Sequence, residues 1–199
     1  MKRKISLTRI HAVNWYGYND SIPVAGNLLF AGLTGSGKSV LMDLLQLVVV
    51  GTDRALFNRS ATGTTSDRTL KSYCLGDTKR EEEGVVQFIR DKGAITYVAL
   101  EFTWPDGERK ETWGIRIEFR NASENFGRVT PFFCDGGLDR GDFLDSERRP
   151  LTHPAFKQLI HARDGRLFET QEQYLRDMAE PSHLNFNRSV LRYADTITI

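Results

Sequence analysis

Eight consecutive residues organise this sequence: Gly32-Leu33-Thr34-Gly35-Ser36-Gly37-Lys38-Ser39. They fit G-x-x-x-x-G-K-[ST], the Walker A pattern, in which each residue type has a physical task. The glycines let backbone N–H groups turn toward phosphate oxygens, and Lys38 brings a positive charge to the β and γ phosphates. The hydroxyl of Ser39 suits a Mg²⁺ ion that also binds the nucleotide. These residues predict a nucleoside triphosphate site in which the backbone from Thr34 to Val40 holds phosphate and Lys38 stabilises charge on the transferred phosphoryl group.

Apolar segments flank this loop on both sides. The run Asn27-Leu28-Leu29-Phe30-Ala31 before it is typical of a short buried strand. Residues 40–50 after it are apolar on most sides, which is typical of a buried helix. Strand, glycine loop and helix follow one another in the order that a phosphate-binding loop requires, so the context favours a site over a chance glycine turn.

The composition limits the classes of protein to consider. A length of 199 residues with 40% apolar residues suits one large domain or two small ones with a sizeable core. The net charge is +1, so any DNA contact has to come from a local patch. No apolar run is long enough to span a membrane and no apolar signal core follows the basic start, which predicts a cytoplasmic protein. Cys74 and Cys134 lack C-x-x-C spacing and are expected to be free thiols, and the histidines show no zinc-binding pattern.

The chain is predicted to form a single lobe with three zones. The first, residues 1–51, holds an opening strand, a turn at Asn19-Asp20, a return strand at 22–24, and then the loop and its helix. The second, residues 52–150, is mainly β, and the third, residues 151–199, is mainly helical.

The second and third zones carry clear periodic patterns. Apolar residues alternate at Trp113, Ile115, Ile117 and Phe119, and Pro105-Asp106-Gly107 is a hairpin turn signal, which together favour an antiparallel meander. A short helix at 68–73 is expected to be capped by Ser66 or Asp67. Strands are predicted at 85–89, 94–104, 112–119 and 128–133, and helices around 156–160 and 171–178.

The pattern S-L-T-R-I-x-x-V-N-W at residues 6–15, the Walker loop, and L-M-D-L-L-Q-L-V at 41–48 together resemble the N-terminal head lobe of SMC-like ATPases. The resemblance is to the MukB-like branch, which includes the JetC subunit of the Wadjet plasmid-defence system. Phe57-Asn58-Arg59 and residues 68–73 are also similar to that branch, and the resemblance covers about the first 75 residues. The chain departs from it at Leu33-Thr34, where most SMC proteins have Glu-Asn or Pro-Asn. Because these positions mainly offer backbone groups, phosphate binding is expected to survive.

The resemblance implies a fold and a division of labour. The fold is an α/β P-loop NTPase lobe of the ABC/SMC head type, with an antiparallel β-meander layer and C-terminal helices. The cofactors are ATP and Mg²⁺, and the Walker B carboxylates and signature motif come from a separate C-terminal head lobe. The implied partners are that lobe, a second SMC-like head, double-stranded DNA and kleisin-type subunits. Val98-Ala99-Leu100-Glu101 is the nearest imitation of Walker B, but it lacks an Asp-Glu pair and alternates like a strand.

The resemblance also suggests residues that flank the nucleotide. Members of the family place the segment after the first strand near the base, which makes Asn14, Trp15 and Tyr16 candidates for base or ribose contacts. The alternative for the two aromatic side chains is packing in the core. The position of the Q-loop glutamine stays open between Gln171, Gln173 and a site beyond the chain.

The best local group of cations consists of Arg54, Arg59, Arg68 and Lys71. Their place after the Walker helix suggests contact with DNA phosphates or an arginine that senses ATP. The alternative is a solvated polar loop, because no aromatic residues are interleaved with these cations.

The sequence therefore leaves two main classes of function. The first is an ATPase head that engages a partner around ATP and drives DNA loading or loop extrusion, with plasmid defence as the setting. The second is a nucleotide-binding regulatory module that does not hydrolyse. A self-sufficient P-loop kinase or GTPase is weaker, because the chain lacks a convincing Walker B and an N-K-x-D motif.

Overall fold

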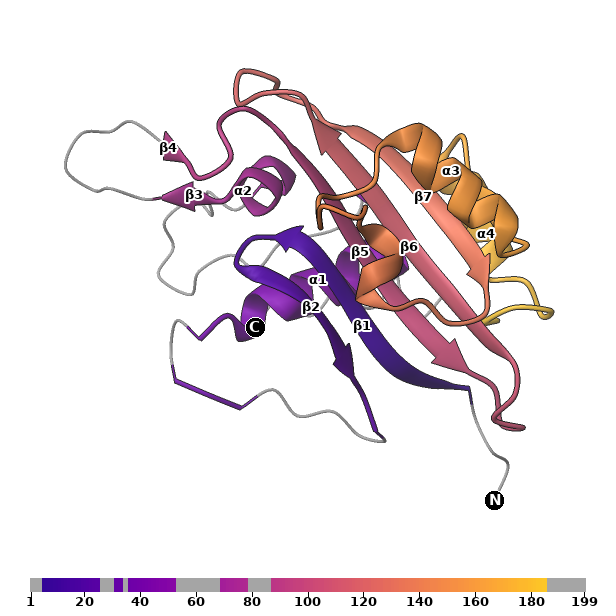
Figure 1. Cartoon of the computed structure of the whole chain (residues 1–199). Coiled ribbons are helices and arrows are strands. Elements are labelled where there is room, and N and C mark those ends of the chain that lie inside the picture. The colour runs from indigo at the N-terminus through magenta and orange to yellow at the C-terminus, as the bar shows by residue number, and fades with distance from the viewer. Residues whose placement is uncertain (1–4, 26–30, 34–35, 53–68, 79–86, 186–199) are drawn as a thin grey trace.

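The computed structural model describes residues 5–25, 31–33, 36–52, 69–78 and 87–185. Its centre is a six-stranded sheet in the order β2-β1-β5-β6-β7-β8, in which all neighbouring strands are antiparallel (Figure 1). A separate two-stranded ribbon pairs β3 with β4. The strands are β1 (Ser6–Trp15), β2 (Tyr18–Pro23), β3 (Asp77–Thr78), β4 (Gln87–Phe88), β5 (Ala94–Thr103), β6 (Lys110–Phe119), β7 (Arg128–Asp135) and β8 (Arg166–Leu167).

Helices cover both faces of the large sheet. Figure 1 shows α3 in front of β7, whereas α1 lies behind β1 and β2. The α1 face also receives α2 and α4, and the α3 face also receives a short 3₁₀ helix, η1. The helices are α1 (Lys38–Val50), α2 (Leu70–Leu75), η1 (Arg140–Phe143), α3 (His153–Ala162) and α4 (Gln171–Met178).

The middle strands serve two cores because successive side chains of a strand point to opposite faces. On β6, Trp113, Ile115 and Ile117 are fully buried against the α1 face. The residues between them, Gly114 and Arg116, face α3, where Gly114 makes room for the ring of Phe132. This two-sided burial explains why the strand is apolar at alternate positions yet still carries a buried arginine.

The α1 face is held together by aromatic residues with polar tips. The ring centroids of Trp113 and Tyr174 are 5.6 Å apart, and those of Trp15 and Tyr73 are 4.5 Å apart. The hydroxyl of Tyr174 donates to the carbonyl of Val48 at 2.9 Å, which ties α4 to α1. Burial raises the pKa of Tyr174 well above its usual value, so this hydroxyl stays a donor.

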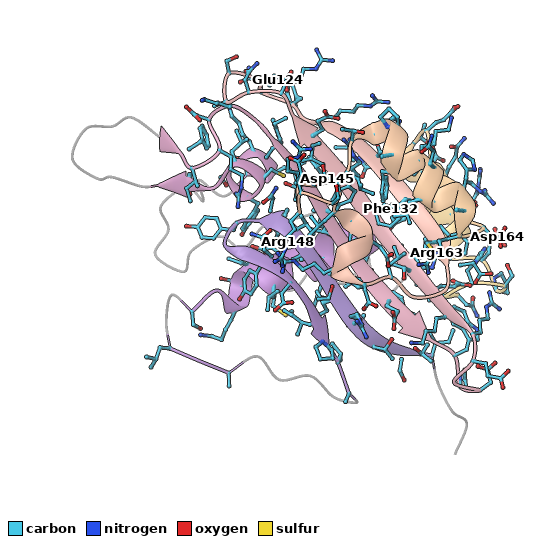
Figure 2. The ribbon with its side chains drawn as sticks, in the orientation of Figure 1. Glu124, Phe132, Asp145, Arg148, Arg163 and Asp164 are labelled. Carbon is cyan, nitrogen blue, oxygen red and sulfur yellow. The ribbon has the colours of Figure 1, made fainter. Side chains whose placement is uncertain are left out.

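The α3 face has its own aromatic core. Phe132 lies beside α3 in Figure 2, and its ring is 4.9 Å from that of Phe156. The ring centroid of Tyr97 is 4.8 Å from that of Phe156 and 5.1 Å from that of Phe143. Because α3 and η1 both dock on these rings, the two short helices are fixed to the sheet by burial rather than by their own length.

The predicted meander is confirmed. β5, β6 and β7 are consecutive neighbours in the sheet, and the N–H of Gly107 closes the predicted turn by donating to the carbonyl of Trp104 at 2.9 Å. The strand interpretation of residues 98–101 is also confirmed, since they lie inside β5. The helices after residue 150 form where the apolar periodicity places them.

The predicted turn at Asn19-Asp20 is wrong. Both residues lie within β2, and the chain turns at Tyr16-Gly17 instead. Asn14 and Tyr16 have φ angles of 56° and 51°, which bend the end of β1 into the turn. The Asn19 side chain accepts from the N–H of Asn14 at 2.8 Å, so it stabilises the hairpin from a strand position.

Two further predictions concern ends of elements. The short helix after residue 68 begins later than predicted and is capped by Thr69, which forms a capping box with Ser72. Ser66 and Asp67 lie outside the described residues, as does most of the strand predicted at residues 27–31. Within the described parts of the chain, no helix has the length and apolar character needed to cross a membrane.

Candidate functional site

The lysine of the loop sits at the start of α1 and closes the loop on itself. Lys38 is the first residue of the helix, and its Nζ donates to the carbonyls of Gly32 and Leu33, each at 2.7 Å. A longer contact of 3.3 Å reaches the hydroxyl of Ser36. The ammonium group thus contacts residues at both ends of the loop. When a phosphate binds, its oxygens, which carry more negative charge, would take the place of these carbonyl oxygens as acceptors.

The residue before Lys38 requires glycine. Gly37 has a φ of 86° and caps α1 without a side-chain hydrogen bond. A Cβ atom at this position would lie 2.7 Å from the hydroxyl oxygen of Tyr18, a half-buried residue at the start of β2. Gly37 is therefore needed both for the backbone conformation and for the close approach of the β1–β2 hairpin.

The end of α1 that meets the loop has the electrostatic character of an anion site. The first turn of α1 contains no acidic residue, so no side chain opposes the positive end of the helix dipole. Ser39 is half-buried in this turn, where the sequence places the Mg²⁺ ligand. Thr34 and Gly35, in the middle of the loop, lie outside the described residues.

Trp15 lies in the core, which is the alternative that the sequence left open. Its side chain is fully buried, stacks on Tyr73, and donates from Nε1 to the carbonyl of Val40 at 2.9 Å. Trp15 therefore anchors the first turn of α1 to β1. It positions the loop and presents no exposed surface to a nucleotide.

Asn14 and Tyr16 are tied to neighbouring strands and helices. Asn14 donates from Nδ2 to the carbonyl of Ile95 at 2.9 Å. The backbone N–H of Tyr16 donates to the carbonyl of Tyr73 at 2.6 Å, while 41% of the residue's surface is exposed. Tyr18, a further aromatic residue of this hairpin, lies close to Gly37, and the sequence analysis missed it.

The group of cations proposed for DNA or ATP sensing is only partly described. Arg54, Arg59 and Arg68 lie outside the described residues. Lys71 lies on α2 with its Nζ 5.2 Å from the centroid of the Phe88 ring, a cation–π contact that turns it toward the β3–β4 ribbon. The group therefore stays a prediction.

Gln171 lies at the opposite end of α1 from the loop. Its Oε1 accepts from the N–H of Thr52 at 2.5 Å, just beyond Gly51, which caps the C-terminal end of α1. A helix of 13 residues is about 20 Å long, so this glutamine is far from the phosphate end. Gln171 thus does not fit the role of a glutamine beside the γ phosphate.

Two of the buried carboxylates after the loop, Asp43 and Glu101, have hydrogen-bond partners away from the phosphate end. Asp43, on α1, accepts a hydrogen bond from the hydroxyl of Tyr73. Glu101 lies on the α3 face, where it accepts from Thr8 at 2.9 Å and from Lys110 at 3.4 Å. The sheet separates Glu101 from the loop, so it cannot serve as the Walker B acid. The whole sequence contains no Asp-Glu dipeptide, so a Walker B pair of that form is not part of this chain.

A comparison with known families identifies the region around the loop. A family model described as the P-loop containing region of an AAA domain matches residues 7–64. Residues 7–64 are thus similar to a P-loop region. The match spans β1, β2, the P-loop and α1, and the geometry of Lys38 and Gly37 agrees with it. No curated protein matches the chain significantly.

The P-loop match supports nucleotide binding in general terms. P-loop domains bind nucleotides together with Mg²⁺, and the residue types at Lys38 and Ser39 are those that such a site uses. Within the described residues, His, Cys, Asp and Glu side chains form no group of three able to hold a metal ion.

Proposed function

We propose that this chain is the ATP-binding half of an SMC-like ATPase head of the MukB type. The observation that carries the proposal is a P-loop with Lys38 at the start of α1, packed on an antiparallel sheet, in a chain whose sequence has no Asp-Glu pair. The site is then completed by a separate C-terminal head lobe, which supplies the Walker B carboxylates and signature motif. ATP-dependent engagement with a second head drives DNA loading or loop extrusion, with plasmid defence as the setting.

The residues have distinct tasks in this proposal. Lys38 leaves the carbonyls of Gly32 and Leu33 and binds the β and γ phosphates of ATP, where it stabilises the charge that develops during transfer. Ser39 binds Mg²⁺, which neutralises phosphate charge. Trp15 holds the first turn of α1 in place.

Exposed apolar residues beside the P-loop support an incomplete site. Leu33, within the loop, is 85% exposed, and Met42, one turn into α1, is 51% exposed. A partner lobe that closes over the nucleotide would cover both residues. Kleisin-type subunits and double-stranded DNA are further partners in this proposal, and Arg54, Arg59, Arg68 and Lys71 are its candidate contacts with DNA or ATP.

The first experiment measures binding of ATP–Mg²⁺ to the 199-residue chain by isothermal titration calorimetry. Lys38→Ala should weaken binding at least tenfold, because a charge-assisted hydrogen bond contributes about 1.5–3 kcal/mol. The matched control is Lys92→Ala, which removes an exposed lysine from a turn. Equal affinities for the wild type and Lys38→Ala would contradict the assignment of the P-loop.

The second experiment separates the ATPase head from a regulatory module. We expect the chain alone to hydrolyse ATP at background rate and to become active when it is joined to a C-terminal lobe with Walker B and signature motifs. Robust turnover by the chain alone would contradict the divided site. ATP binding without turnover in any reconstituted head would favour the non-hydrolysing module.

A further inference from the structure

A second group of cations lies on the opposite face of the sheet from the P-loop. It consists of Arg116 on β6, Arg128 on β7, and His153 and Lys157 on the first two turns of α3, and we call it the Arg116 cluster. Arg116 and Arg128 share a face because Arg116 pairs with Thr130, two residues along β7. The sheet lies between this cluster and the described residues of the P-loop, because α1 and α3 pack on opposite faces.

Arg116 is fully buried beneath the start of α3. Its Nε donates to the hydroxyl oxygen of Tyr97 at 3.2 Å, and that hydroxyl donates to the carbonyl of Leu151 at 2.7 Å, two residues before the helix. Nη1 donates to Glu118 at 2.9 Å. Nη2 is also buried but has no partner in the described part of the chain. A buried guanidinium with an unused donor requires an acceptor.

His153 supplies a second unused donor. Its Nε2 is 3.5 Å from Nη2 of Arg128. A guanidinium group only donates, so this contact assigns Nε2 as the acceptor and places the imidazole proton on Nδ1. Nδ1 is buried without a partner among the described residues. Both unused groups of the cluster are therefore N–H donors, and both call for an acceptor.

The charges around these donors also favour an anion. Glu118 forms an ion pair with Arg116 and lies opposite Arg128 in the β6–β7 register, and it is the one carboxylate set against the cations named here; Arg128 and Lys157 make no ion pair within the described residues. The first turn of α3 has no acidic residue, and its N-cap, Thr152, makes no side-chain hydrogen bond. Burial lowers the pKa of His153, and Arg128, Arg116 and Lys157 lower it further against the opposing effect of Glu118. Water could satisfy the donors, whereas an oxyanion would also interact favourably with the net positive charge of the cluster.

We propose that the Arg116 cluster is a binding site for a phosphate-type oxyanion, separate from the P-loop. The anion accepts from Nη2 of Arg116 and Nδ1 of His153, and it balances the charges of Arg128 and Lys157. The exposed Arg128 side chain swings to admit the anion, and its planar fork suits a phosphate. The source of the phosphate is either a small free anion or the backbone of DNA.

The test follows the pKa of His153 by NMR in the 199-residue chain, with His153→Gln used to assign its signal among the four histidines. Inorganic phosphate should raise the pKa of His153 by about one unit or more, because a bound opposite charge favours the protonated ring. Sodium chloride at equal ionic strength should not. Either no shift with phosphate or an equal shift with chloride overturns the proposal.

A pair of variants locates the effect. Arg128→Gln should abolish the shift caused by phosphate, measured against the variant's own pKa without phosphate. Arg120→Gln, which removes an exposed arginine just beyond β6, should preserve it. A full phosphate shift in Arg128→Gln overturns the proposal.

A further arm identifies the source of the phosphate. Short duplex DNA is added in phosphate-free buffer, and the same His153 signal is followed. A shift with DNA assigns the site to a phosphodiester, and a shift with inorganic phosphate alone assigns it to a small anion. If neither probe shifts the signal, there is no oxyanion site.

Discussion

Replacing Gly37 with alanine tests the geometry of the P-loop directly. A φ of 86° is left-handed and costs a non-glycine residue about 1–2 kcal/mol. The new Cβ would also lie 2.7 Å from the Tyr18 hydroxyl oxygen, which would have to move. Alanine restricts the unfolded chain, which offsets about 0.4–1 kcal/mol of this loss. We therefore expect Gly37→Ala to lower the free energy of unfolding by about 2 kcal/mol.

The assay is urea denaturation followed by tryptophan fluorescence, since Trp15 and Trp113 are fully buried. In a Tyr18→Phe background the hydroxyl is gone, and the same glycine substitution should cost about 1 kcal/mol less. Gly17→Ala is the matched control, because nothing lies within 4 Å of its added Cβ, and it should change stability by less than about 0.5 kcal/mol. Equal losses from Gly37→Ala in the two backgrounds would refute the contact between Tyr18 and the loop.

Three further predictions concern buried groups. Trp15→Phe should lower the free energy of unfolding in urea by about 1–3 kcal/mol, because a buried hydrogen bond to Val40 and part of the buried indole are lost, and unchanged stability would contradict this. Burial lowers the pKa of His11 from its usual 6.5 to about 4, so the neutral form is favoured in the folded chain. The contribution of neutral His11 to the free energy of unfolding should therefore be fully present above about pH 6.5, and up to about 3 kcal/mol of it should be lost as the pH drops toward 4. In urea titrations at several pH values, the free energy of unfolding of His11→Gln should depend less on pH. Burial raises the pKa of Cys74 and of Cys134 to about 12, so a thiol reagent should modify them only as urea unfolds the chain, and rapid labelling of the native protein would disprove their burial.

The sequence predicted the elements whose signals are local. The loop and α1 follow from residue types at fixed spacing, and β6 follows from apolar alternation at Trp113, Ile115 and Ile117. Both elements form where they were predicted, because these patterns depend on local residue spacing rather than on distant partners.

The β1–β2 hairpin was predicted less well because its geometry depends on distant residues. Asn19 looks like a turn residue, yet the turn lies earlier because the N–H of Tyr16 donates to Tyr73 and its carbonyl accepts from Arg90. Those partners are more than fifty residues away in the sequence. No local pattern contains this information, so the sequence placed the turn at the wrong residues.

Tyr18 was missed for a related reason. It lies nineteen positions before Gly37, and only the pairing of Tyr18 with Trp15 brings its ring to the loop. Trp15 was open to two interpretations because a large aromatic residue suits both a nucleotide and a core. Its full burial and the hydrogen bond from its indole to the carbonyl of Val40 favour the interpretation as a core residue.

The two-sided burial of β6 has a consequence for how this chain tolerates changes in length. One inserted or deleted residue within the strand would exchange the faces of all side chains beyond it. Such a change after Gly114 would turn Arg116 toward α1 and Ile115 toward α3, so both cores would lose their packing at once. Insertions and deletions in related sequences should therefore be confined to connections such as residues 104–109 and 120–127, while the spacing from β5 through β7 stays constant within each strand.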